Sequence, residues 1–211
     1  MNPQPLQIVL ASSNPGKINE IRLLAKKLPI EWILQSDLNI PDADETQKTF
    51  IENAILKARH AAKLSGLPAL ADDSGLVVDA LNGEPGVYSA RYAGKDATAQ
   101  MRNQKLLEAL HGVKEEDRAA SYHCVLALVE QENDPVPLIC HGIWEGSILF
   151  EPRSSNGFGY DPIFYVPTHN CSAAELTTEE KNRISHRGQV MAQLIGVFEE
   201  IILTPFSMRS R

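Results

Sequence analysis

The alternation of apolar and polar positions divides the start of the chain into a strand, a helix and a second strand. The apolar run at residues 6–11 predicts a buried strand, because it is short and ends at polar residues. A helix should follow it, since Asn14 has the chemistry of an N-cap and Pro15 suits the first helical position. Residues 30–35 form the next short apolar run and predict a second strand.

The next segment predicts a longer helix and then two strands. Thr49 and Glu52 have the spacing of a capping box, which indicates a helix that reaches about Leu64. Residues 68–73 and 75–81 are strand-like runs on either side of the sequence DDSG. Asp, Ser and Gly are ordinary turn residues, so we expect a tight turn between two short strands at this point.

The second half of the chain predicts long strands followed by helices. A helix is expected near residues 97–111, and the runs at 119–130 and 135–150 are expected to pair as a hairpin. A second capping box, from Thr177 to Glu180, opens a short helix that the sequence SHRG separates from a final one. Strands and helices in this order predict an α/β fold with a mixed sheet.

Composition and charge narrow the classes of protein that the chain can represent. A chain of 211 residues with 43% hydrophobic content can bury one good core, so we expect a single domain over residues 1–211, built as one unit or as two closely joined lobes. A net charge of −7 argues against general binding to nucleic acid or to an anionic membrane. Three cysteines without metal-ligand spacing, no signal peptide and no long apolar run predict a soluble cytoplasmic protein.

The sequence SSNPGK, residues 12–17, is the first candidate for binding chemistry. The N-terminus of a helix offers free N–H groups and a positive dipole end, and Lys17 adds an ammonium group. Donors of this kind suit a phosphate chain. The alternative is a capped helix with a solvated lysine. Ile18 rules out a strict P-loop, which needs Ser or Thr at that position. The segment offers six candidate residues: Ser12, Ser13, Asn14, Pro15, Gly16 and Lys17.

Carboxylates are the second group of candidates. Asp72 and Asp73 are adjacent, and like charges at that spacing need a cation or a raised pKa. In an extended chain they point to opposite sides, so one could hold Mg²⁺ or activate water. Asp44 and Glu45 lie in an acidic loop whose oxygen ligands suit Mg²⁺ or Mn²⁺, although such loops are usually only solvated. Lys57 is either a surface residue or a second phosphate-binding cation.

Two later segments could recognise a nucleobase. Phe158 and Tyr160, in the loop NGFGYD, could stack on a base while Asp161 reads one of its edges, and the alternative for either aromatic ring is core packing. His186 and Arg187 stand at the break between the last two helices, where they offer donors for a carbonyl or phosphate group. Lys181 lies about one helical turn earlier. The alternative interpretation of the His186–Arg187 segment is a helix cap with a solvated arginine.

Taken together and in this order, six segments resemble the inosine triphosphate pyrophosphatase family, the RdgB/Ham1-like house-cleaning nucleotidases. They are SSNPGK, TFIENAILKARHAA, ADDSGL, GVYSARYAG, FGYDPIF and AELTTEEKNRISHRG, and the resemblance extends from about residue 8 to residue 198. It implies an elongated α/β fold with a central mixed sheet flanked by helices, two lobes and an active-site cleft between them. It also implies a homodimer that uses Mg²⁺ to hydrolyse ITP, dITP and XTP to the monophosphate and pyrophosphate.

The resemblance also implies roles for individual residues. Ser12, Asn14 and Lys17 would bind the triphosphate. Asp73 would accept a proton and bind the metal with Asp44 or Glu45, and Asp72 is the alternative base. Ser74 would touch the substrate. The side that binds the nucleobase would comprise Phe158, Gly159, Tyr160, Asp161, Lys181, His186 and Arg187.

The chain departs from the family pattern at two places, and two other functions compete with this one. Ser12 and Ser13 replace the usual Thr-Gly, and Asp44 replaces the first of two frequent glutamates, which leaves open whether Asp44 or Glu45 binds the metal. One competing function is a Maf-like pyrophosphatase for modified pyrimidine nucleotides. The other is a nucleotide-binding module without catalysis.

Overall fold

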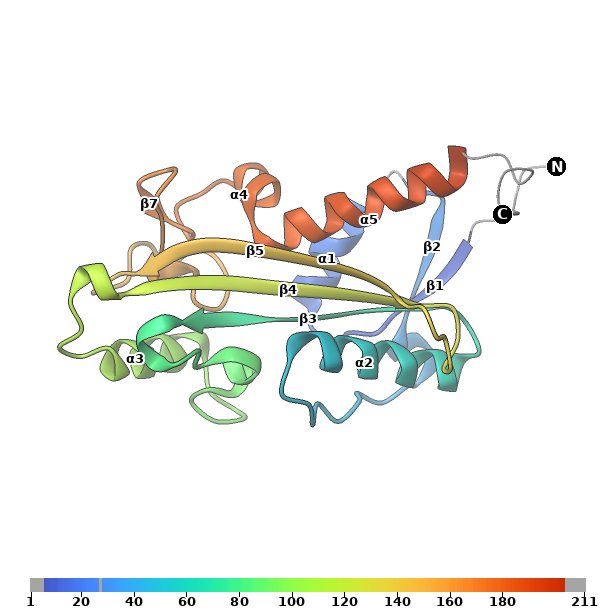
Figure 1. Cartoon of the computed structure of the whole chain (residues 1–211), viewed down its shortest axis with the longest axis horizontal. Helices are drawn as coiled ribbons and strands as arrows, with labels where there is room; N and C mark the ends of the chain where they lie inside the picture. The colour runs from blue at the N-terminus through green and yellow to red at the C-terminus, as the bar shows by residue number, and fades with distance from the viewer. Residues whose placement is uncertain (1–5, 27, 204–211) are drawn as a thin grey trace.

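The computed structural model describes residues 6–26 and 28–203, with side chains to residue 199. Its strands form one mixed seven-stranded sheet in the order β2-β1-β3-β4-β5-β6-β7, which confirms the predicted α/β class (Figure 1). The strands are β1 (Leu6–Leu10), β2 (Ile30–Leu34), β3 (Ala69–Val78), β4 (Ala119–Val129), β5 (Leu138–Ile148), β6 (Phe164–Val166) and β7 (Cys171–Ser172). The α-helices are α1 (Pro15–Leu24), α2 (Phe50–Ser65), α3 (Ala99–Ala109), α4 (Thr178–Ile184) and α5 (His186–Leu203).

The turn predicted at DDSG is wrong. Residues 69–78 form one continuous strand, β3, in which Asp73 pairs with Val125 and Ser74 with Cys124 of β4. The ten-residue antiparallel ladder with β4 outweighs the turn preference of Asp, Ser and Gly. Asp72 and Asp73 therefore lie in the middle of a strand rather than at its end, and they do project to opposite faces of the sheet.

The free edge of β3 determines where a site can form. Strand β1 is parallel to β3 and pairs with it only at Val9–Ala69 and Leu10–Leu70. Beyond Leu10, the chain leaves the sheet toward α1, whereas β3 continues for eight residues past Leu70. The Asp72–Asp73 segment thus follows the carboxyl end of β1, which is the usual ligand position in α/β sheets.

Helices cover both faces of the sheet and divide the core into clusters. In Figure 1, α2 and α3 lie on one side of the long strands, and α1, α4 and α5 on the other. Two apolar clusters surround the β1 end, one under α1 and α5 around Leu10 and Met191, the other under α2 around Ala58. A third lies toward the opposite end, around Leu106 and Phe164. Cys124 and Cys140 are buried.

The start of α5 is fixed by close packing on β5. A methyl group at Gly142 would come within 2.4 Å of the His186 carbonyl oxygen, so only glycine allows this approach. Thr177 and Glu180 form the predicted capping box of α4, and Ser185 separates α4 from α5. His186 and Arg187 consequently stand at the first positions of a helix held against the sheet.

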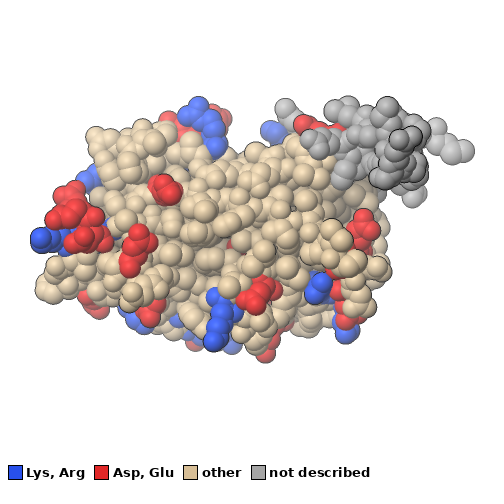
Figure 2. Space-filling view, in the orientation of Figure 1, with Lys and Arg blue, Asp and Glu red and all other residues tan. Residues whose placement is uncertain are grey.

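The surface carries charges of both signs. Figure 2 shows charged side chains mainly near the outline of the visible face, with uncharged residues over its centre. This face has no continuous basic patch of described residues. Within the described part of the chain, no helix combines the length and the apolar character needed to cross a membrane.

Candidate active site

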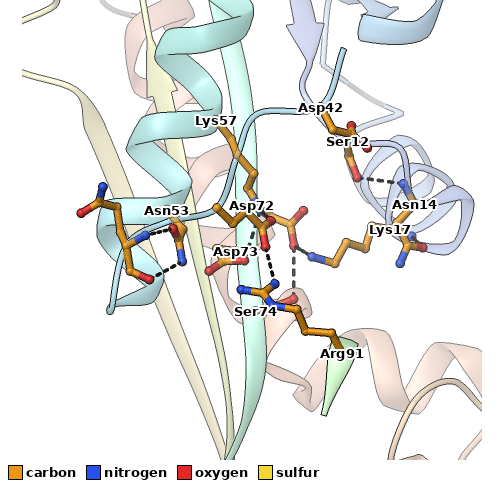
Figure 3. A network of polar contacts seen from close by, with 12 residues as sticks. Ser12, Asn14, Lys17, Asp42, Asn53, Lys57, Asp72, Asp73, Ser74 and Arg91 are labelled. Atoms are coloured by element: carbon orange, nitrogen blue, oxygen red, sulfur yellow. Dashed lines mark hydrogen bonds and ion pairs between the residues drawn. The ribbon is translucent and has the colours of Figure 1, made fainter. Parts of the chain in front are cut away.

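The start of α1 is a capped helix terminus that carries Lys17 into the cleft. The Asn14 side chain accepts hydrogen bonds from the N–H groups of Gly16 and Lys17, at 3.0 and 3.3 Å, and Ser12 Oγ accepts one from the Asn14 N–H. Lys17 extends from this turn to the sheet, where Nζ lies 2.7 Å from Asp72 Oδ2 (Figure 3). The cap is as predicted, and the lysine is an ion-pair partner at the sheet instead of a solvated side chain.

Asp72 is a buried structural carboxylate on the α1 face of β3. Burial alone would raise its pKa, but Lys17, Lys57 and Arg187 outweigh burial and lower the pKa to about 2. The group is therefore ionised throughout the neutral range. Ser74, on the same face, donates a hydrogen bond to Asp72 at 3.3 Å. Asp72 itself is not among the residues that line the cleft.

Asp73 occupies the opposite face, against α2. Lys57 Nζ lies 3.1 Å from Asp73 Oδ1 (Figure 3). It also lies 2.8 Å from Glu45 Oε1, and Arg91 binds the other oxygen of Glu45 at 3.1 Å. The second oxygen of Asp73, Oδ2, is buried and has no hydrogen-bond partner among the described residues. This face thus gathers two carboxylates around one ammonium group.

The sharing of one cation explains the acid–base properties of this cluster. Burial raises the pKa of Asp73, and the nearby Glu45 and Asp72 add to the rise that Lys57 and Lys17 oppose. Burial would lower the pKa of Lys57, but Asp73, Asp72 and Glu45 raise it above the ordinary value, so Lys57 stays protonated. Asp73 is therefore the better proton acceptor of the two adjacent aspartates.

The acidic loop is held against α2 by several side chains. Asn53, buried in α2, accepts a hydrogen bond from the Gln47 N–H and donates one to the Gln47 carbonyl. Gln35 donates to Asp42, and His60 Nε2 lies 2.9 Å from the Pro41 carbonyl. These contacts turn Glu45 toward Lys57, whereas Asp44 is exposed at the margin.

His186 lies on an aromatic wall on the other side of the cleft. Its ring stacks on Tyr122 with centroids 4.7 Å apart and an angle of 7° between planes. His186 Nδ1 is buried and unpaired within the described structure. Burial, then the charges of Arg187 and Lys181, lower the pKa of His186 well below its usual value, so the imidazole is neutral. Arg187 forms an ion pair with Glu20 and donates to Ser74 Oγ at 3.4 Å.

The loop at residues 157–161 closes the same side. Asp161 Oδ2 accepts hydrogen bonds from the Phe158 N–H and from Lys181 Nζ, both at 2.5 Å. Tyr160 is buried and donates to the Ser89 carbonyl at 2.9 Å. Phe158 stays partly exposed, and its ring would lie 3.9 Å from a methyl group at Gly16. Asp161 and Tyr160 thus fix the conformation of the loop, and the aromatic ring of Phe158 remains accessible to a ligand.

A single cleft of about 890 Å³ collects most of these side chains. Of the residues predicted from sequence, it is lined by Ser12, Ser13, Asn14, Lys17, Asp44, Glu45, Lys57, Asp73, Ser74, Phe158, Gly159, Tyr160, Asp161, Lys181, His186 and Arg187. Pro15, Gly16 and Asp72 do not line it. Glu20, Arg91 and Tyr122 were not predicted. Arg91 does lie within the segment GVYSARYAG, but nothing in the sequence indicates the contacts that these three residues make.

Asp73 and Glu45 are the carboxylates that could hold a divalent cation. The described residues contain no preformed group of three or more His, Cys, Asp or Glu side chains arranged for a metal. Mg²⁺ commonly takes one or two carboxylates and completes its shell with water and substrate phosphates. The buried Oδ2 of Asp73, which has no partner in the described part of the chain, and the adjacent Glu45 fit this requirement.

Fold and site together define an α/β protein with one main cleft beside the free edge of β3. The cleft contains lysines and arginines paired with carboxylates, and this combination of charges suits a phosphorylated ligand. The chain belongs to the Ham1 family, whose model matches residues 8–197.

Individual relatives are similar over nearly their whole length. A curated dITP/XTP pyrophosphatase of Coxiella burnetii is 61% identical over 94% of this chain and 99% of the relative. The Escherichia coli K12 protein of the same name is 54% identical over 90% and 96%. The solved structure of a HAM1 protein from Coxiella burnetii superposes with a TM-score of 0.88 at 62% identity, covering 92% and 99% of the two chains. The Staphylococcus aureus Ham1 protein gives 0.83 at 40% identity, covering 92% and 99%.

Proposed function

We propose that the protein hydrolyses non-standard purine nucleoside triphosphates, namely ITP, dITP and XTP, to the monophosphate and pyrophosphate. This activity removes deaminated purines from the nucleotide pool. The observation that carries the proposal is Asp73, which lines the cleft together with Lys17 and Lys57. Its pKa is raised, and its buried Oδ2 has no hydrogen-bond partner among the described residues. The names of the similar proteins point to the same substrates.

The chain's own groups account for binding and water activation. Lys17 and Lys57, together with the positive dipole end of α1, hold the triphosphate. The triphosphate replaces the carboxylates as the partner of both lysines. Ser12 and Ser74 add hydroxyl donors. Asp73 orients a water for in-line attack at the α-phosphorus and accepts its proton. Because phosphoryl transfer depends mainly on positioning and electrostatics, this inventory is sufficient.

Asp73 and Glu45 are proposed to hold Mg²⁺ during the reaction. When bound, the ion would offset charge on the triphosphate and on the departing pyrophosphate. Glu45 is preferred to Asp44 as the second ligand because it already faces Asp73 across Lys57. Omission of divalent ions is accordingly expected to abolish pyrophosphate release.

Base selection is assigned to the wall opposite the carboxylates. Phe158 is placed to stack on the purine, and the neutral His186 and the adjacent Arg187 donate hydrogen bonds to its 6-oxo group. Adenine carries an amino donor at that position and would leave these donors unpaired. Lys181 and Asp161 hold the loop that carries Phe158.

A panel of nucleotides tests the function. Pyrophosphate release should be fast with ITP, dITP and XTP, and slow with ATP and GTP. Equal rates on all purines would contradict the proposal. Preference for a modified pyrimidine triphosphate would favour the Maf-like alternative, and tight ITP binding without pyrophosphate release would favour the non-catalytic module.

The oligomeric state and the location of the protein are part of the same proposal. We infer a homodimer of single-domain, two-lobed chains from the family resemblance, and sedimentation of the purified protein tests it. Cytoplasmic location is supported by three free cysteines, Cys124, Cys140 and Cys171, and by the nucleotide substrate.

A further inference from the structure

Two histidines meet outside the cleft, on neighbouring strands of the sheet. His123 of β4 pairs with Ile143, and His141 of β5 pairs with Val125, so the two histidines are diagonal neighbours on one face. His123 Nδ1 lies 3.2 Å from His141 Nε2, and the ring centroids are 5.4 Å apart. Neither histidine lines the cleft, and the proposed reaction uses neither of them.

The separation of the two nitrogens matches a shared metal ion. Zinc binds imidazole nitrogen at about 2.0–2.1 Å with tetrahedral geometry, which places two such nitrogens about 3.3 Å apart. The observed distance of 3.2 Å, which is also a hydrogen-bonding distance in the metal-free protein, is close to this value. Both histidines are anchored in a long antiparallel pair of strands, so their backbones are held in fixed register.

His123 is oriented by its other neighbours. Ser121 Oγ lies 3.0 Å from His123 Nε2, and the Phe50 ring stacks on His123 with centroids 5.9 Å apart. When Nε2–H donates to Ser121, Nδ1 keeps its lone pair on the side of His141. Metal-binding histidines are commonly fixed by such a hydrogen bond at the second nitrogen.

We propose that His123 Nδ1 and His141 Nε2 form a binding site for one divalent transition-metal ion of the Zn²⁺ class. Water completes its coordination. Imidazole ligands favour Zn²⁺, Ni²⁺ and Cu²⁺, whereas Mg²⁺ prefers oxygen ligands, so this site and the Asp73–Glu45 site select different ions. Val125, the partner of Asp73 on β4, is also the partner of His141 on β5. His141 thus lies about 10 Å from Asp73, two strand spacings away, and His123 lies on the intervening strand.

Titration of the full chain with Zn²⁺, in the presence of excess Mg²⁺ to occupy the carboxylates, tests the site by calorimetry. The wild type should bind one Zn²⁺ per chain. His123→Gln and His141→Gln should each weaken binding by at least about tenfold, and Ser121→Ala by about tenfold, since loss of a partner that orients a ligand costs 10–100-fold. His60→Gln and Cys171→Ser are the matched controls and should bind as the wild type does.

Three results would overturn the proposal: no saturable Zn²⁺ binding by the wild type, unchanged affinity in both histidine variants, or loss of binding in either control instead. Nitrogen-15 NMR of the wild-type imidazoles gives a measurement that needs no variant. Zinc should shift Nδ1 of His123 and Nε2 of His141, and shifts confined to other histidines would contradict the assignment.

Discussion

The Asp73→Asn variant should release pyrophosphate from ITP with a kcat lower by about 10²–10⁴-fold, the usual contribution of a general base. The amide keeps the size of the side chain between Lys57 and Glu45 but accepts no proton and carries no negative charge. In the wild type, kcat should fall as the pH drops through the raised pKa of Asp73, and the Asn variant should lack this acidic limb. Turnover close to that of the wild type would refute the role of Asp73.

The same substitution should leave the fold intact. Folding raises the pKa of Asp73, so its contribution to stability is present below the unfolded pKa and is lost as the pH rises through the folded value. At pH 7 the ionised carboxylate therefore opposes folding, and its removal should not lower the melting temperature. This measurement separates loss of chemistry from loss of structure.

Asp72→Asn is the matched control, because the same change is made one residue away on the opposite face. Its carboxylate has a pKa of about 2 and is bound to Lys17, so it is a poor proton acceptor. We expect reduced stability at neutral pH and a smaller loss of kcat than in Asp73→Asn. A larger loss of kcat in Asp72→Asn would transfer the role of base to Asp72.

The second large effect concerns base selection at His186. The wild type should prefer ITP to ATP by up to ~10⁴ in kcat/KM, since sites built to pair a polar group reject analogues that lack it. His186→Phe keeps an aromatic ring against Tyr122 but removes both ring nitrogens. It should lower kcat/KM for ITP by about 10- to 100-fold, equivalent to about 1–3 kcal/mol for one buried hydrogen-bond partner.

ATP hydrolysis by the same variant is the internal control for this prediction. Because adenine does not accept a hydrogen bond from His186, the low kcat/KM for ATP should change little in the variant. An equal fall for ITP and ATP would mean that His186 supports the fold of the cleft and does not read the base.

Local sequence signals predicted much of the fold because they depend on neighbouring residues. The Asn14 cap, the Thr177–Glu180 capping box and the β4–β5 hairpin are all of this kind. The error at DDSG has a tertiary cause. Turn-forming residues became part of a strand because β4 pairs along the whole of β3, while Lys17 and Lys57 neutralise the aspartates from its two faces.

The composition of the candidate site was also largely predictable, but its pairings were not. Arg187 meets Glu20 across 167 residues of sequence, and Lys57 meets Glu45 and Asp73 from different elements. The ion pair of Arg91 with Glu45 was not predicted, because it depends on where the short helix η3 (Gly86–Arg91) packs against β3. Such contacts follow from the register of the sheet, which the alternation of apolar residues does not specify.

Hydrolysis of ITP in ¹⁸O-labelled water tests the central claim most directly, because it locates the phosphorus atom that water attacks. With Asp73 activating water toward the α-phosphorus, mass spectrometry should find one ¹⁸O atom in the inosine monophosphate and none in the pyrophosphate. Label in the pyrophosphate, release of orthophosphate as the first product, or absence of turnover would contradict the account.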